Sequence, residues 1–191
     1  MSLLWREQNC HPAVSERDFK RLLRFPPGRK WAEPLAENAR WARAWFAENA
    51  RPWSAACRLP APPVADWAGR FEAETELIAV AVSAGPEAET EAAVRWREEE
   101  PDRYFFLECY AAAVVETLLA DARKRLGVKR HLCPGYPGWP ITDNQPLFAA
   151  LVTAGAMAGP LEVLSSGMLS PKKSQLAVCA VPHESVAHLI P

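Results

Sequence analysis

The sequence predicts an α+β domain in which a mostly antiparallel, twisted sheet packs against helices. Residues 77–82 form an apolar run without alternation, which is typical of a strand buried on both faces. A long helical pattern occupies residues 103–126. Other segments of strand length are separated by helices and loops of unequal length, with no regular βαβ repeat. With 191 residues, 49% of them hydrophobic, the chain is long enough for one such domain with an N-terminal helical arm.

The N-terminal part predicts two helices. Ser15 precedes two acidic residues in the next three positions, so we expect it to cap a helix that ends before the Pro-Pro-Gly at residues 26–28. A second helix is expected over residues 32–50. Its aromatic residues recur at i, i+4 and i+5, which predicts a stripe facing the core rather than a cofactor site: Trp41, Trp45 and Phe46.

A proline-rich breaker divides the chain. Residues 54–59 have the pattern of a short strand, and the Pro-Ala-Pro-Pro at residues 60–63 ends it. We therefore predict two portions, an N-terminal helical portion (1–62) packed on the main body and an α+β core (63–191).

The core portion begins with the apolar strand, which Gly85-Pro86 terminates. A helix rich in Glu and Ala follows to about residue 100, Pro101 opens the longest helix, and Gly127 is a typical C-terminal stop. Because an apolar strand must be covered, we expect the long helix and the strand to bury seven side chains together: Leu77, Ile78, Val80, Val82, Phe106, Val114 and Leu118.

The C-terminal part combines a loop, helices and strands. Residues 131–140 are a loop dense in Pro and Gly, after which Asp143 is expected to cap a helix that ends near residue 153. Strands are expected at residues 161–164 and 175–181, followed by a short helix after Pro182.

Charge and hydropathy exclude several classes of function. The net charge of −1 argues against a general polyanion binder, so no nucleic-acid partner is expected. The basic residues within 17–30 and the acidic residues within 87–102 are expected to be solvated faces. The sequence has neither an apolar run of about 18 residues nor an N-terminal signal-peptide pattern, so no membrane partner is expected. It has no Gly-x-Gly-x-x-Gly, which leaves a Rossmann nucleotide site unsupported.

The five cysteines are scattered, and none belongs to a Cys-x-x-Cys pair. This pattern predicts neither a structural zinc site nor a disulfide framework, and it favours a reducing cytoplasm. A metalloenzyme built on Cys10 and His11, or on His131 and Cys133, is a minor alternative, because two neighbouring ligand types do not make a tetrahedral site. No Ser/His/Asp or Cys/His constellation is recognisable, so no catalytic residue is predicted.

The loop at residues 133–140 reads Cys-Pro-Gly-Tyr-Pro-Gly-Trp-Pro. Proline stiffens such a backbone and glycine allows tight turns, while Tyr136 and Trp139 offer flat apolar faces with a polar tip. Two interpretations follow from the residues themselves. The loop holds a flat ligand, or it is a structural turn buried under its aromatic side chains.

Two motifs together resemble the activation domain of cobalamin-dependent methionine synthase, including its free-standing relatives. Residues 133–140 resemble the Gly-Tyr part of the family's Arg-x-x-x-Gly-Tyr motif with its nearby Pro, and residues 164–174 (LSSGMLSPKKS) resemble its second conserved stretch. The Ala-rich segment 110–116 and the strand that ends at Gly85 are similar to elements that precede these motifs. The resemblance covers about residues 70–181.

The chain departs from the family pattern at two positions. His131 stands where the family has its arginine, with Arg130 one residue early, and Ser165 stands where the family has a glutamate. A histidine cannot reproduce the two parallel hydrogen bonds of an arginine to a carboxylate. We expect Arg130 to take over this role if ligand binding is retained.

The resemblance implies a protein that binds S-adenosylmethionine and presents it to a corrinoid (cobalamin) methyltransferase partner, whose oxidised cobalt is reactivated by reductive methylation in methionine biosynthesis. Cobalamin would then be present only on the partner, and catalysis would consist of positioning and the exclusion of water. The motifs are expected to lie side by side along one groove. The implied ligand-binding residues are Glu116, Arg130, His131, Cys133, Pro134, Gly135, Tyr136, Pro140, Ser165, Ser166, Met168 and Lys173.

A second hypothesis belongs to a different class of function. The changes at His131 and Ser165 favour a non-catalytic binding or assembly protein that has kept the scaffold and lost S-adenosylmethionine binding.

Overall fold

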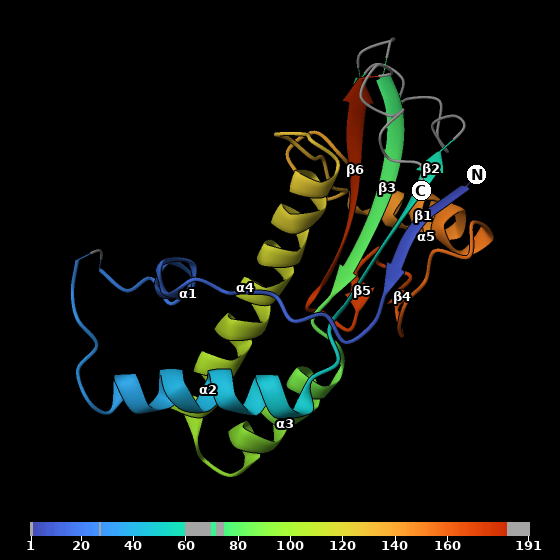
Figure 1. Ribbon diagram of the computed structural model, residues 1–191. Coiled ribbons are helices and arrows are strands. Elements are labelled where there is room, and N and C mark those ends of the chain that lie inside the picture. The colour runs from blue at the N-terminus through green and yellow to red at the C-terminus, as the bar shows by residue number, and fades with distance from the viewer. Residues whose placement is uncertain (1, 27, 60–69, 72–74, 183–191) are drawn as a thin grey trace.

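A four-stranded antiparallel sheet forms the centre of the molecule (Figure 1). The computed structural model describes residues 2–26, 28–59, 70–71 and 75–182. The strands are β1 (Ser2–Glu7), β2 (Trp53–Leu59), β3 (Thr75–Ser83) and β6 (Ser174–Pro182), and they lie in the order β1-β2-β3-β6. Each neighbouring pair is antiparallel. The predicted α+β class with an antiparallel sheet is confirmed.

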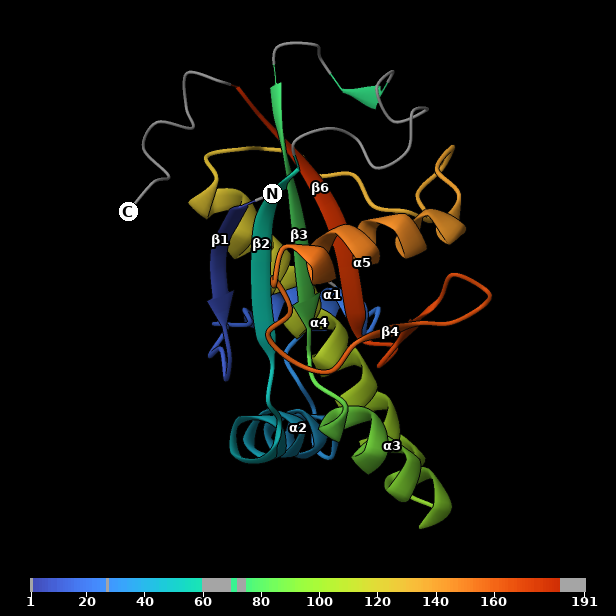
Figure 2. The same ribbon diagram turned by 90° about the vertical axis from the view of Figure 1, so that its right-hand side faces the viewer.

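Helices cover both faces of this sheet (Figure 2). The long helix α4 (Pro101–Arg125) crosses one face, and α5 (Asn144–Thr153) crosses the other. Three further helices, α1 (Glu16–Leu22), α2 (Leu35–Asn49) and α3 (Glu87–Arg97), pack against α4. A 3₁₀ turn, η2 (Ile141–Asp143), precedes α5, and a small hairpin of β4 (Glu162–Val163) and β5 (Leu169–Ser170) follows it.

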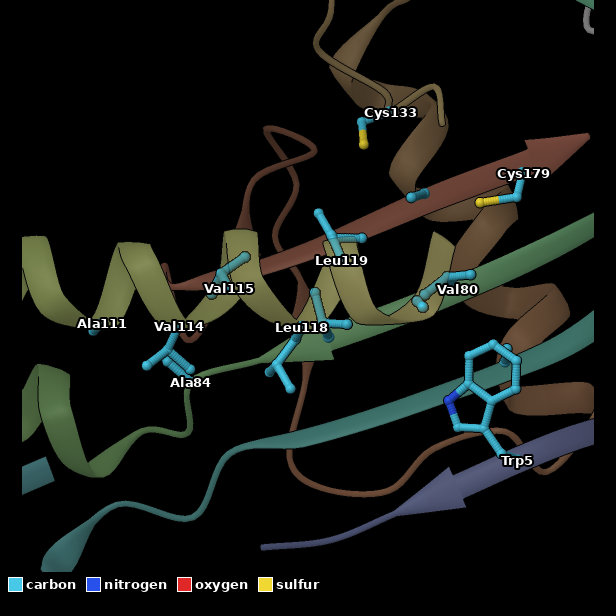
Figure 3. Close-up of a cluster of buried hydrophobic side chains, with 14 of the residues drawn as sticks. Trp5, Val80, Ala84, Ala111, Val114, Val115, Leu118, Leu119, Cys133 and Cys179 are labelled. Atoms are coloured by element: carbon cyan, nitrogen blue, oxygen red, sulfur yellow. The ribbon is translucent and has the colours of Figure 1, made fainter. Parts of the chain in front are cut away.

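Strand β3 is apolar without alternation because both of its faces are buried. Ile78 and Val80 face α4 and belong to one cluster with Val114 and Leu118 (Figure 3). Leu77 faces the opposite way, into the cluster beneath α5.

All seven predicted core residues are buried, but the expectation that they form one cluster is wrong. Successive strand residues point to opposite faces, which places Leu77 on the α5 side. Phe106 packs instead against Phe19 of α1, at a ring-centroid distance of 6.1 Å.

The N-terminal portion contributes two strands to the sheet as well as two helices. Strand β1 was not predicted, since the first ten residues show no clear alternation. It is fixed by Trp5, which is buried and donates a hydrogen bond from its indole nitrogen to Ser54 Oγ at 3.0 Å. The predicted boundary after residue 62 lies outside the described residues, and strands from both sides of it pair in the same sheet.

Several local signals act as expected. Ser15 caps α1 by accepting a hydrogen bond from the backbone N–H of Asp18 at 3.0 Å. The stripe on α2 faces the core, with Phe46 buried and both tryptophans packed against the same cluster. Gly127, with φ of +68°, follows the end of α4.

Two expectations near the C-terminus have other outcomes. Asp143 precedes α5 but makes no capping hydrogen bond, because its carboxylate accepts the indole N–H of Trp139 at 2.7 Å. The short helix expected after Pro182 lies outside the described residues. Of the helices that the structure describes, none has the length and apolarity required to cross a bilayer.

Candidate functional site

The loop at residues 131–140 lies along the edge strand β6. Leu132 and Val178 exchange two backbone hydrogen bonds, of 2.9 and 2.8 Å, which attach the loop to the strand edge. A free strand edge offers unpaired backbone groups, so this bridge both covers the edge and fixes the start of the loop. The loop is therefore held at the edge of the sheet that β6 forms.

The two aromatic residues of the loop have different roles. Trp139 is only 4% exposed and belongs to the core beneath α5. Tyr136 is 41% exposed. Backbone hydrogen bonds from Tyr136 N to Cys133 O and from Trp139 N to Tyr136 O, of 3.1 and 2.8 Å, hold the turn between them. The structural interpretation of the loop thus holds for Trp139, and Tyr136 remains available to a ligand.

A small polar network surrounds the hydroxyl group of Tyr136. His131 Nε2 lies 3.1 Å from this oxygen, and Gln175 Nε2 lies 3.4 Å from it. The same amide nitrogen of Gln175 lies 3.1 Å from Cys133 Sγ. Sequence reasoning missed Gln175, whose only signal is that it follows Ser174 as the second polar residue at the start of a strand that is apolar from there on.

The titratable groups of this network are uncharged at neutral pH. Burial, reinforced by the positive charge of Arg123, lowers the pKa of His131 below its ordinary value. Burial also raises the pKa of Tyr136, and it raises the pKa of the Cys133 thiol to about 12. His131 is therefore a neutral imidazole, and Cys133 is neither a nucleophile nor a ready metal ligand.

A groove of about 530 Å³ opens beside this network, bordered by α1, α4, the loop and β6. We call it the α1–α4 groove. Its lining residues are Ala13, Asp18, Arg21, Glu116, Thr117, Leu119, Ala120, Arg123, His131, Tyr136 and Gln175. The structure thus brings three of the predicted residues together: Glu116, His131 and Tyr136.

The cations of this groove come from helices and not from the loop. Arg123 of α4 lines it, with its Nη1 donating to Lys129 O at 2.9 Å. Its buried Nε has no hydrogen-bond partner among the described residues. Arg21 of α1 pairs with Glu116. Arg130 is exposed and is absent from the groove lining.

The two motifs are neighbours, as predicted. Pro134 and Met168 line a second, smaller pocket of about 200 Å³ beside Gln175, which also lines the α1–α4 groove. Asn144 donates a hydrogen bond to Gly167 O at 2.9 Å and so fastens the second motif to the start of α5. A side chain at Gly167 would meet the carbonyl oxygen of Ile141 at 2.7 Å, so only glycine allows this approach.

The remaining predicted residues lie apart from the α1–α4 groove. Ser165 and Ser166 are exposed in the turn of the β4–β5 hairpin, where Ser166 Oγ accepts the N–H of Met168 at 3.3 Å. Lys173 pairs with Glu108 of α4 at 3.2 Å. Gly135 and Pro140 are exposed positions of the loop.

Other pockets contain the remaining candidate residues. Cys10 and His11 line two grooves of about 380 and 400 Å³, where burial raises the pKa of Cys10. Among the residues that the structure describes, no group of three or more His, Cys, Asp or Glu side chains could hold a metal ion. Neither Cys10 with His11 nor His131 with Cys133 therefore acquires a third ligand there.

Comparison with known proteins identifies the fold. No family model matches the sequence, and no curated protein matches it. The structure is similar to a crystal structure of the MetH reactivation domain bound to AdoHcy, with a TM-score of 0.66 and 11% sequence identity over 94% of this chain and 78% of that one. The chain therefore has the fold of the MetH reactivation domain.

Proposed function

We propose that this protein binds S-adenosylmethionine in the α1–α4 groove and presents it to a corrinoid-carrying methyltransferase partner that requires reactivation. The observation that carries the proposal is a groove that joins Arg123, Glu116 and the exposed ring of Tyr136. The fold also supports the proposal, because it is shared with a domain that was crystallised with AdoHcy. AdoHcy is the molecule that remains when S-adenosylmethionine gives up its methyl group.

The residues of the groove fit such a ligand. Its volume of about 530 Å³ is within the range of about 300–1,000 Å³ typical of small-molecule sites, whereas the neighbouring pocket of about 200 Å³ is too small. Arg123 would bind the carboxylate of the amino-acid group, and Glu116 its ammonium group. The ring of Tyr136 offers a face to the adenine.

Arg123 takes the place that the sequence suggested for Arg130. The family motif has an arginine where this chain has His131, and the neutral imidazole of His131 cannot clamp a carboxylate. Arg123 reaches the same groove from α4, and its Nε has no hydrogen-bond partner in the part of the chain that the structure describes. His131 instead lies against the Tyr136 hydroxyl and orients the ring.

The protein residues position the ligand. When bound, S-adenosylmethionine supplies an activated methyl group for the corrinoid of the partner. Positioning and the exclusion of water need no acid–base pair.

Calorimetric titration with S-adenosylmethionine tests the proposal. We expect binding in the micromolar range and a loss of about one to two powers of ten in affinity for Arg123→Ala, because a hydrogen bond to a charged group is worth about 1.5–3 kcal/mol. The matched control is Arg130→Ala, which removes an exposed arginine from the same region and should leave affinity unchanged. Equal affinities for Arg123→Ala and the unmodified protein would exclude the proposed site.

A binding or assembly protein without this ligand is the second candidate. It is favoured by the ion pair between Arg21 and Glu116, which already occupies the acid that would receive the ligand ammonium. In that case the titration gives only heat of dilution at millimolar ligand, while a cooperative melt shows that the protein is folded.

A further inference from the structure

Arg21 is held at the α1–α4 groove by the anchoring of its helix. Phe19, two residues earlier, is fully buried. Its ring contacts Phe106 and Tyr110 of α4 edge-on, at centroid distances of 6.1 and 5.1 Å. These contacts fix α1 against α4, so the guanidinium group of Arg21 stays near the groove although its side chain is flexible.

One guanidinium group engages both acidic side chains that line the groove. Arg21 Nη2 pairs with Glu116 Oε2 on α4. Arg21 Nε lies 3.8 Å from Asp18 Oδ1 on its own helix. The groove therefore already contains a cation at the place where its negative charge is concentrated.

The pairing with Glu116 is exposed and easily exchanged. The side chains of Arg21 and Glu116 are 55% and 45% exposed. Exposed ion pairs of this kind typically change an equilibrium by no more than about fivefold. Asp18 lies three residues before Arg21, so the released guanidinium would keep an acidic neighbour.

We propose that Arg21 is a displaceable internal cation that occupies the ammonium site at Glu116 and thereby lowers the affinity of the groove for ligands with a cationic head group. A ligand ammonium replaces the guanidinium at Glu116, and Arg21 turns toward Asp18. A neutral ligand has no group that can make this exchange. The inference rests on the proposed binding of S-adenosylmethionine in this groove.

Comparing the binding of two nucleosides tests this inference separately from the proposed function on which it rests. S-adenosylmethionine carries a charged amino-acid head group and a cationic sulfonium, whereas 5′-methylthioadenosine has the same 5′-thioadenosine part with a neutral thioether and no amino-acid group. Arg21→Ala removes the competing guanidinium. It should raise the affinity for S-adenosylmethionine about two- to fivefold and leave the affinity for 5′-methylthioadenosine unchanged. The ratio of the two affinities, measured by calorimetry, is the readout.

Three further variants serve as controls. Arg17→Ala removes the same charge from the exposed side of the same helix and should change neither affinity. Arg21→Lys keeps the charge and should stay close to the unmodified protein. When Glu116 is already replaced in Glu116→Gln, Arg21→Ala should no longer raise the affinity for S-adenosylmethionine, because the acid for which the two cations compete is gone.

Each result has a defined meaning. If both nucleosides bind but Arg21→Ala leaves the ratio of the S-adenosylmethionine affinity to the 5′-methylthioadenosine affinity unchanged or lowers it, this inference is overturned. The proposed function then still stands. If neither nucleoside binds to any correctly folded variant, the proposed function fails, and the inference fails with it.

Discussion

His131 Nε2 lies 3.1 Å from the hydroxyl oxygen of Tyr136, so a histidine where the family has an arginine contacts the tyrosine of the same motif. The contact stays within the loop. Gln175 of β6 approaches the same hydroxyl at 3.4 Å and joins the loop to the sheet. In this chain, the side chain of His131 therefore supports the ring of Tyr136.

Tyr136 should matter for binding through its ring. Stacking of a base on an aromatic side chain is worth about 1–3 kcal/mol, so Tyr136→Ala is expected to weaken S-adenosylmethionine by about five- to 150-fold. Tyr136→Phe keeps the ring and loses only the contacts to His131 and Gln175, and it should retain most of the affinity. Calorimetry on both variants measures the difference. An equal loss in both variants would show that the hydroxyl network, and not the ring, carries binding.

The stability of the protein should depend on pH through His131. Its pKa is lowered in the folded state by burial and by Arg123, whereas in the unfolded chain it lies near the ordinary 6.5. Between these two values the unfolded state binds a proton that the native state does not. The free energy of unfolding should therefore fall as pH falls below about 6.5, and level off once the folded-state pKa is passed.

Urea unfolding at several pH values, with and without His131→Gln, isolates this contribution. The variant should lose the His131 part of the pH dependence while other groups continue to contribute. Identical slopes in the two proteins would mean that His131 titrates alike in both states.

The contact between α4 and the sheet should dominate stability. Leu118 is 5% exposed and lies in the cluster that α4 forms with β3 (Figure 3). Leu118→Ala is expected to lower the free energy of unfolding by about 2–5 kcal/mol, measured by urea denaturation. The matched control is Leu164→Ala on the hairpin, where the leucine is 45% exposed and the change should stay within about 0.5 kcal/mol. Similar losses in the two variants would contradict the assigned core.

Gly167, in the second motif, should be irreplaceable. Gly167 has φ of +83°, and a methyl group there would collide with the backbone of η2. Gly138 has a similar φ of +78° with open space around its Cα. Gly138→Ala should cost only the backbone strain, about 1–2 kcal/mol, and Gly167→Ala should cost more. Urea midpoints that rank the two in the opposite order would show that the hairpin does not pack on η2 in solution.

The thiols should react in the order of their burial. Burial raises the pKa of Cys57 to about 11 and those of Cys133 and Cys179 to about 12, while Cys10 and Cys109 are partly exposed. Alkylation of the native protein near pH 8 should therefore modify Cys10 and Cys109 first, as mass spectrometry of peptides can follow. Early modification of Cys133 would indicate that the loop opens.

Local signals in the sequence determined where many elements begin and end. The hydroxyl of Ser15, the ring of Pro101 and the freedom of Gly127 act within one turn of chain, so their effects hold whatever packs around them. The apolar run at residues 77–82 likewise required cover on both faces, which the structure provides. The family resemblance rested on two motifs, and these border one small pocket.

Tertiary structure alone decided which side chains share the groove. Arg21 and Glu116 are separated by 95 residues and Tyr136 and Gln175 by 39, so no spacing rule brings them together. Arg130 was the nearest arginine to the motif in sequence, but it does not line the groove, whereas Arg123 does because it lies on α4, which borders the groove. The pairing of β1 with β2 is equally non-local, since the edge strand is defined by hydrogen bonds to residues 54–58 and not by its own pattern. Local signals act through a few neighbouring dihedral angles, whereas a binding site depends on contacts that form only when distant segments pack.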